Sequence, residues 1–144
     1  MKVSSILKRK GMNVVTVRPD VTIATAAREM TTKEIGALVV SEDGRTVLGL
    51  LGERDIVRGL AFHGARVGDL RVSDLMTRSV VTCDPEQSFT AVMAAMTHHR
   101  ARHLPVVENR QLCGIVSIGD IVKHRLEELE TETNILREAF IARH

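Results

Sequence analysis

The chain repeats itself at a spacing of 66 residues, and this internal repeat constrains the fold more than any other feature of the sequence. Residues 14–19 read VVTVRP, and residues 80–85 read VVTCDP. Each half then carries four apolar residues at the i, i+3, i+4, i+7 spacing of an amphipathic helix. They are Ile23, Ala26, Ala27 and Met30 in the first half and Phe89, Val92, Met93 and Met96 in the second. Thr22 and Ser88 stand just before, where a hydroxyl oxygen caps a helix N-terminus.

The repeat continues through the remaining segments of each half. Three further pairs recur in the same order: 3–7 with 72–76, 38–40 with 104–106, and 49–57 with 114–122, the last at an offset of 65. Each half therefore reads β-α-β-β-α, which predicts an α/β (α+β) fold. Because a unit of roughly 50–60 residues can barely cover its own sheet, we expect two copies to pack as a pseudo-twofold pair.

This pattern predicts three parts along the chain. The parts are a first repeat with its N-terminal lead-in (1–68), a second repeat with its lead-in (69–125) and a helical tail (126–144). A pair of packed units leaves two equivalent clefts where the halves meet, and such clefts favour small ligands.

Composition excludes several classes of function. Twenty basic and eighteen acidic residues leave no global field for a polyanion, and three aromatic residues do not make a base-stacking platform. No apolar run is long enough to span a bilayer, so we expect a cytoplasmic protein without a membrane partner. Two cysteines without a CxxC spacing fit neither a disulfide scaffold nor a zinc site, and we expect no metal.

The duplicated order of elements, together with LPVV at 104–107 and GIVSIGD at 114–120, resembles the CBS-domain pair, or Bateman module. The resemblance covers residues 3–125. It implies a non-catalytic module that binds adenosine-containing ligands such as AMP, ADP, ATP, S-adenosylmethionine or NAD. The physics of the motif agrees, since a carboxylate at a helix start can accept from both ribose hydroxyls and free N–H groups there favour phosphate.

The resemblance also implies which residues line the two clefts. In one cleft Asp120 binds the ribose, and Ser117 offers a hydroxyl group. Its other expected residues are Ile118, Gly119, Val14, Val15, Thr16, Ile35, Gly36 and Ala37. The second cleft is expected to contain Asp55, Arg54, Val80, Val81, Thr82, Ala101, Arg102 and His103. Gly52 departs from the family pattern, because Ser or Thr usually occupies that position, so this cleft loses one polar contact.

The long stretch after Asp120 contains no glycine or proline, which predicts one extended helix. Along it, apolar positions alternate in steps of four and three, and Thr133 interrupts them. This seam consists of Val122, Leu126, Leu129, Thr133, Leu136 and Phe140. Its partner is either the lead-in 3–7 or the same helix of a second chain, and we expect a homodimer.

The expected mechanism is linkage, in which an adenine nucleotide or NAD changes the arrangement of the halves and thus the surface offered to an unidentified target protein. Three other interpretations stay open. The chain could be a nucleotide hydrolase, a nucleic-acid-binding protein that uses the basic cluster 98–103, or a structural module whose aspartates only cap helices.

Overall fold

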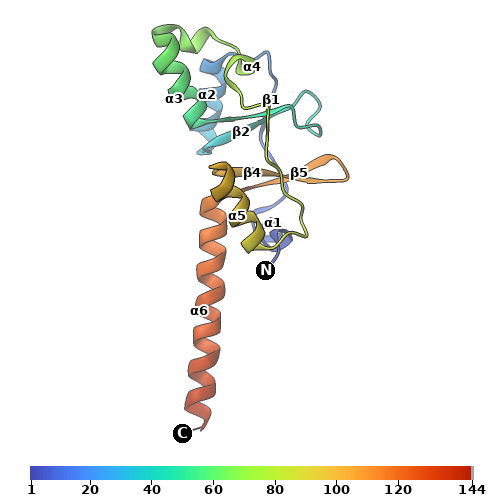
Figure 1. The fold of residues 1–144 in the computed structure, drawn as a ribbon, viewed down its shortest axis with the longest axis vertical. Helices are drawn as coiled ribbons and strands as arrows, with labels where there is room; N and C mark the ends of the chain where they lie inside the picture. The colour runs from blue at the N-terminus through green and yellow to red at the C-terminus, as the bar shows by residue number, and fades with distance from the viewer. Residues whose placement is uncertain (144) are drawn as a thin grey trace.

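The computed structural model describes residues 1–143, so His144, at the end of the predicted tail, lies outside the described residues. The first half contains a three-stranded sheet in the order β1-β2-β3, where β1 (Thr16–Val17) runs parallel to β2 (Ala37–Val40) and β3 (Gly49–Gly52) antiparallel to it. The helices α2 (Ile23–Lys33) and α3 (Glu53–His63) complete this half, followed by the 3₁₀ turn η1 (Gly64–Asp69). The predicted α/β (α+β) architecture is confirmed (Figure 1).

The second half repeats this order of elements but lacks a regular first strand. It contains α5 (Phe89–His99), the hairpin β4 (His103–Glu108) and β5 (Gln111–Ser117), and α6 (Ile118–Arg143). The first strand, predicted around residues 80–85, is reduced to a single bridge between Cys83 and Val106. In the first half Val39 N–H donates to Val15 O at 3.4 Å, but the corresponding residue is Pro105, which has no N–H to donate.

Capping fixes where the two equivalent helices begin and end. The Thr22 hydroxyl accepts from Thr25 N–H at 3.3 Å, and the Ser88 hydroxyl accepts from Ala91 N–H at 3.1 Å, as predicted. Both helices end at a residue in the left-handed region, Glu34 and Arg100, each with φ of 53°. The segments after these two residues therefore leave their helices in the same way, towards the junction of the halves.

The two lead-in helices exchange places between the halves. The first, α1 (Val3–Lys10), packs on the second half, where Val3 N–H donates to Gln87 O at 2.9 Å. The second, α4 (Val72–Leu75), packs on the first half, where Val72 N–H donates to Val21 O at 2.8 Å. In Figure 1 the N-terminal α1 accordingly lies with the second half, where it contacts β5 and α6, and α4 lies beside α3 of the first half.

Each hydrophobic core is consequently built from both ends of the repeat. One core contains Ile23, Ala26, Met30, Leu38, Val40 and Leu51 together with Val72 from α4. The other contains Cys83, Phe89, Val92, Met96, Leu104, Val106, Val116 and Ile121 together with Val3, Ile6 and Leu7 from α1. The boundary at residue 69 stays a prediction, but neither half has a complete core without the other half's lead-in.

The glycines that open β3 and lie within β5 make room for the exchanged lead-ins. A Cβ on Gly49 would lie 2.7 Å from Met76 Sδ and 3.0 Å from Thr77 O. A Cβ on Gly114 would lie 2.5 Å from Leu7 Cδ2. Both copies of the repeat therefore need glycine at this position, because a side chain would clash with the lead-in packed there.

The helix α6 is continuous over 26 residues, and its C-terminal part projects from the body (Figure 1). Ile121 and His124 are buried against the second half, whereas Val122, Leu126, Leu129 and Leu136 of the predicted seam are 41–70% exposed. The lead-in α1 therefore does not cover the seam. Of the two partners expected for the seam, the lead-in 3–7 was wrong. No helix within residues 1–143 is long and apolar enough to cross a membrane.

Replacement of Gly49 by alanine tests the exchanged packing. We expect Gly49→Ala to lower the free energy of unfolding by about 1–3 kcal/mol, because the added methyl group meets the Thr77 carbonyl oxygen and Met76. Gly68→Ala is the matched control, because its Cβ would meet only Ala24 Cβ at 3.6 Å. Urea unfolding measures both variants, and an equal loss of stability in the two would contradict the packing described.

Candidate functional site

Two cavities lie between the halves, one near each predicted aspartate. The Asp55 cleft, of about 520 Å³, is lined by Gly36, Leu50, Gly52, Glu53, Arg54, Asp55, Arg58, Thr77, Ser79, Val80, Val81, His99, Arg100, Ala101, Arg102 and His103. The Asp120 cleft, of about 310 Å³, is lined by Lys10, Asn13, Val14, Val15, Glu34, Ile35, Gly36, Ala37, His103, Ile115 and Ser117. Both volumes lie in or near the range of small-ligand sites.

Most of the residues expected in each cleft lie together. Of the set around Asp55, Thr82 alone is absent from the cavity lining. Of the set around Asp120, four residues do not line the open space: Thr16, Ile118, Gly119 and Asp120 itself. Gly36 and His103 line both cavities, so the two clefts meet at these residues.

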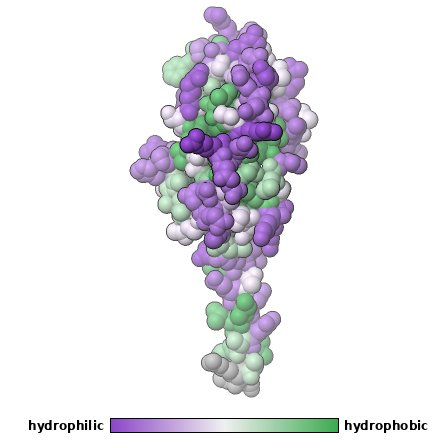
Figure 2. Space-filling view, turned by 90° about the vertical axis from the view of Figure 1, so that its right-hand side faces the viewer, coloured by the Kyte–Doolittle hydropathy of each residue, from purple (hydrophilic) through white to green (hydrophobic). Residues whose placement is uncertain are grey.

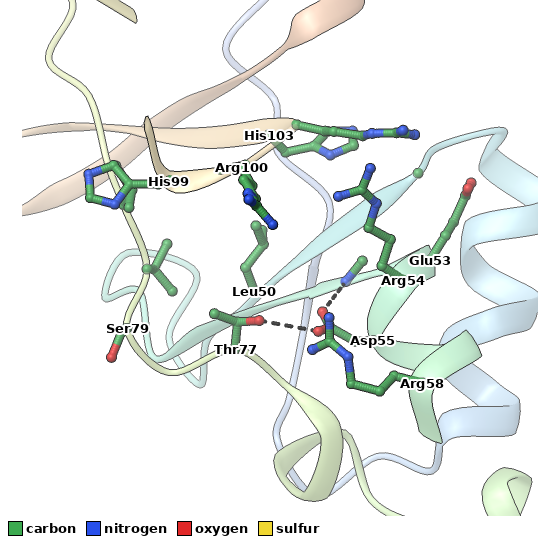
Figure 3. Close-up of a pocket in the computed structure, with 16 residues that line it drawn as sticks. Leu50, Glu53, Arg54, Asp55, Arg58, Thr77, Ser79, His99, Arg100 and His103 are labelled. Carbon is green, nitrogen blue, oxygen red and sulfur yellow. Dashed lines mark hydrogen bonds between the residues drawn. The ribbon is translucent and has the colours of Figure 1, made fainter. Parts of the chain in front are cut away.

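Asp55 is held at the start of α3 with part of its hydrogen-bonding capacity free. Its Oδ2 accepts from Gly52 N–H at 2.8 Å, and its Oδ1 accepts from the Thr77 hydroxyl at 3.2 Å (Figure 3). Each carboxylate oxygen has two acceptor sites, so both oxygens can take a further donor such as a ribose hydroxyl. Thr77, which follows α4, thus supplies a hydroxyl group to Asp55. Gly52, at the position where the family usually has Ser or Thr, cannot supply one.

The wall of the Asp55 cleft is rich in arginine. Arg54 and Arg58 come from α3, and Arg100 and Arg102 come from the segment between α5 and β4. Figure 3 shows Arg54 extending towards Arg100 and His103 on the opposite side. Within residues 1–143, none of the four guanidinium groups has a side-chain hydrogen bond or ion pair, so their donors are available to an anion.

Thr77 and Arg58 were not among the expected residues. The first comes from the exchanged lead-in, whose position the sequence pattern does not reveal. The second lies four residues after Arg54 on the same helix, and one helical turn places such residues on the same face. That spacing was a usable signal for Arg58.

Asp120 closes a reciprocal cap with Ser117. Ser117 N–H donates to Asp120 Oδ2 at 2.9 Å, and Asp120 N–H donates to Ser117 Oγ at 3.0 Å. The Lys10 ammonium also donates to Oδ2, at 2.7 Å. Burial alone raises the pKa of Asp120, but the bonds from Lys10 and Ser117 and the charge of Lys10 outweigh it, so the pKa lies below its ordinary value.

His103 separates the two clefts and is half-buried. Its pKa lies below its ordinary value of 6.5, first because of burial and then because of the positive charge of Lys10. Asp120 and Glu53 act in the opposite direction, and Arg102 adds to the lowering. The part of the chain that the structure describes contains no group of three His, Cys, Asp or Glu side chains arranged to hold a metal ion.

The lowered pKa of His103 predicts a pH dependence of stability. Since the unfolded chain takes up this proton at a higher pH than the folded chain, stability should fall as the pH drops below about 6.5 towards the folded pKa. His103→Asn should flatten this decline. Urea unfolding between about pH 5.5 and 7.5 measures it, and an unchanged slope in the variant would refute the assignment.

Comparisons with known proteins agree with this geometry. The family model described as "CBS domain" matches residues 3–61 and 72–127. The CBS domain-containing protein CBSX3, mitochondrial, of Arabidopsis thaliana is 33% identical over 138 residues, which is 90% of this chain and 67% of that protein. The crystal structure of ATU1752 from Agrobacterium tumefaciens, a CBS-domain-containing protein, has a TM-score of 0.84 and 46% identity, covering 87% of this chain and 99% of that one.

A third similarity concerns the fold. The CBS domain pair of MJ0100, solved in complex with 5′-methylthioadenosine and S-adenosylmethionine, has a TM-score of 0.75 at 24% identity and covers 85% of this chain and 98% of that one. The family model spans most of this chain, and its two matched segments follow the two copies of the repeat. The chain therefore belongs to the CBS-domain family and contains a pair of CBS domains.

Proposed function

We propose that this chain is a regulatory module whose Asp55 cleft binds an adenosine-containing nucleotide, such as AMP, ADP, ATP or NAD. The observation that carries the proposal is the cluster of four arginines, without side-chain partners in residues 1–143, around a cavity that also contains a helix-start carboxylate. The carboxylate of Asp55 accepts from the ribose hydroxyls. The guanidinium groups bind the phosphates.

The Asp55 cleft supports this function better than the Asp120 cleft. The sequence favours Asp120, because Ser117 stands beside it where Gly52 stands beside Asp55. Asp120, however, already forms an ion pair with Lys10, and its cavity is the smaller of the two. A ligand reaches Asp55 without displacing a charged side chain.

Occupancy of this cleft would be transmitted through the junction of the halves. The cleft takes residues from α3 in the first half and from the segment 99–103 in the second, so a bound nucleotide bridges the two. A ligand that binds one arrangement of the halves more tightly shifts the population towards it. The target protein that reads this change is not identified, and the cytoplasmic location stays a prediction.

The nucleic-acid alternative is less well supported by the geometry. His99, Arg100, Arg102 and His103 of the cluster 98–103 face a concave cavity between the halves. A cavity of this size admits a small anion more readily than a duplex. The hydrolase alternative predicts the release of AMP or adenosine from ATP or NAD, and product analysis of the titrated samples detects it.

Calorimetric titration with AMP, ADP, ATP, NAD and S-adenosylmethionine tests the proposal. We expect at least one adenine nucleotide to bind the wild type, and Asp55→Ala to weaken that binding by about tenfold or more, because charged hydrogen bonds to the ribose are lost. Asp74→Ala is the matched control, because Asp74 caps α4 through Arg71 N–H at 2.8 Å and does not line the cleft.

Asp55→Ala and Asp74→Ala each remove one helix cap, at a cost of about 1 kcal/mol, so a general loss of stability would affect both variants. Equal affinities in the two variants would contradict the role of Asp55. If none of the five compounds bound the wild type, the proposed function would be wrong.

The oligomer is a separate part of the proposal. We propose a homodimer whose interface includes the seam of α6, because its apolar side chains are exposed on a helix that projects from the body. Figure 2 shows hydrophobic surface along this projecting helix. The alternating spacing of four and three residues fits packing against an identical helix.

Analytical ultracentrifugation tests this assembly. We expect the wild type to be a dimer at micromolar concentration. We expect the Leu129→Glu variant to be a monomer, since a carboxylate in an apolar seam is costly to bury. Thr131→Glu adds the same charge about 200° around the helix and should leave the dimer intact. A monomeric wild type would disprove the homodimer.

A further inference from the structure

Lys10 occupies the place in the Asp120 cleft that a ribose would need. Its ammonium donates to Asp120 Oδ2 at 2.7 Å and to Ile115 O at 3.1 Å. The Lys10 side chain is 36% exposed and that of Asp120 23% exposed, so the pair lies partly shielded from water. Oδ2 also accepts from Ser117 N–H, so both acceptor sites of this oxygen are filled, whereas Oδ1 keeps its two sites free within residues 1–143. A ribose whose two hydroxyl groups each bind one carboxylate oxygen therefore has to displace the ammonium from Oδ2.

The exchanged lead-in holds Lys10 in this position. Lys10 is the last residue of α1, whose Val3, Ile6 and Leu7 are buried in the core of the second half. The neighbouring Arg9 forms an ion pair with Glu127 of α6. The backbone of Lys10 is therefore fixed relative to α6, and its side chain alone is free to leave Asp120.

The Asp55 cleft has no equivalent of this lysine. The offset of 69 residues that aligns the lead-ins 3–7 and 72–76 places Ser79 opposite Lys10. A serine side chain is too short to form the contact that Lys10 makes, and it carries no charge. The two clefts therefore differ in whether a cation must leave Oδ2 before a ribose can bind both oxygens of the aspartate.

Displacement of Lys10 has a cost that depends on the ligand. An uncharged nucleoside would separate the ion pair and leave an ammonium in a partly shielded cavity beside His103. A nucleotide offers its phosphate as a new partner for the same ammonium. Glu34 also lines this cavity, and if it received the displaced ammonium instead, an uncharged ligand would enter as readily as a charged one.

We infer that Lys10 is the specificity-determining residue of the Asp120 cleft, which admits an adenosine ligand with a phosphate and excludes the uncharged nucleoside. The inference rests on the proposed binding of adenosine compounds. Lys10 has two roles in this proposal. Its ammonium pairs with Asp120 while the cleft is empty, and it binds the phosphate when a nucleotide enters.

The test compares AMP with adenosine by calorimetry in Asp55→Ala, where the Asp120 cleft alone retains its aspartate. We expect AMP to bind at least about tenfold more tightly than adenosine, as an added charge-assisted bond implies. Adding Lys10→Met to this variant should weaken the binding of AMP and strengthen the binding of adenosine. The ratio of the two affinities should therefore fall towards one. Lys8→Met, an exposed lysine on the same helix, should leave the ratio unchanged.

Three results would overturn the inference. They are a ratio that Lys10→Met does not change, an equal change with Lys8→Met, and a lack of binding of either compound both to Asp55→Ala and to the double variant. The wild type is titrated in parallel. If it binds neither compound nor any nucleotide, the proposed function fails; if it binds AMP, the failure concerns Lys10 alone.

Discussion

The exchange of the two lead-in helices is the constraint on which the rest of the structure depends. Val3 of α1 completes the core of the second half, and Val72 of α4 completes that of the first. Gly49 and Gly114 are required because the exchanged segments pack directly on them. The same exchange brings Thr77 to Asp55 and Lys10 to Asp120. The packing that makes the halves interdependent therefore also furnishes both clefts.

The two halves of the repeat differ in structure and charge because of a few single residues. Pro105 removes one backbone donor and reduces a predicted strand to one bridge. Lys10 and Ser79 occupy corresponding places, and only the lysine neutralises its aspartate. The arginines of α3 and of the segment 99–103 surround Asp55 alone. One fold thus presents a larger, arginine-rich cleft and a smaller one whose aspartate is ion-paired, and the two meet at Gly36 and His103.

Much of the architecture was predictable from the sequence, because the repeat encodes local patterns. The offset of 66 residues, the capping residues Thr22 and Ser88 and the uninterrupted stretch after Asp120 indicated elements that the structure confirms. The exchange of the lead-ins was not predictable, since two similar helices fit two similar cores in either arrangement. Thr77 and Lys10 were missed for that reason. With both residues placed, the cleft favoured for nucleotide binding changed from that of Asp120 to that of Asp55.

A two-dimensional ¹H–¹⁵N NMR titration of the whole chain with ATP tests nucleotide binding at the Asp55 cleft most directly. We expect the amide signals of Gly52, Asp55 and Arg102 to shift at lower ATP concentrations than those of Ser117 and Asp120. Earlier shifts around Asp120, or changes that spare both clefts, would contradict nucleotide binding at the Asp55 cleft.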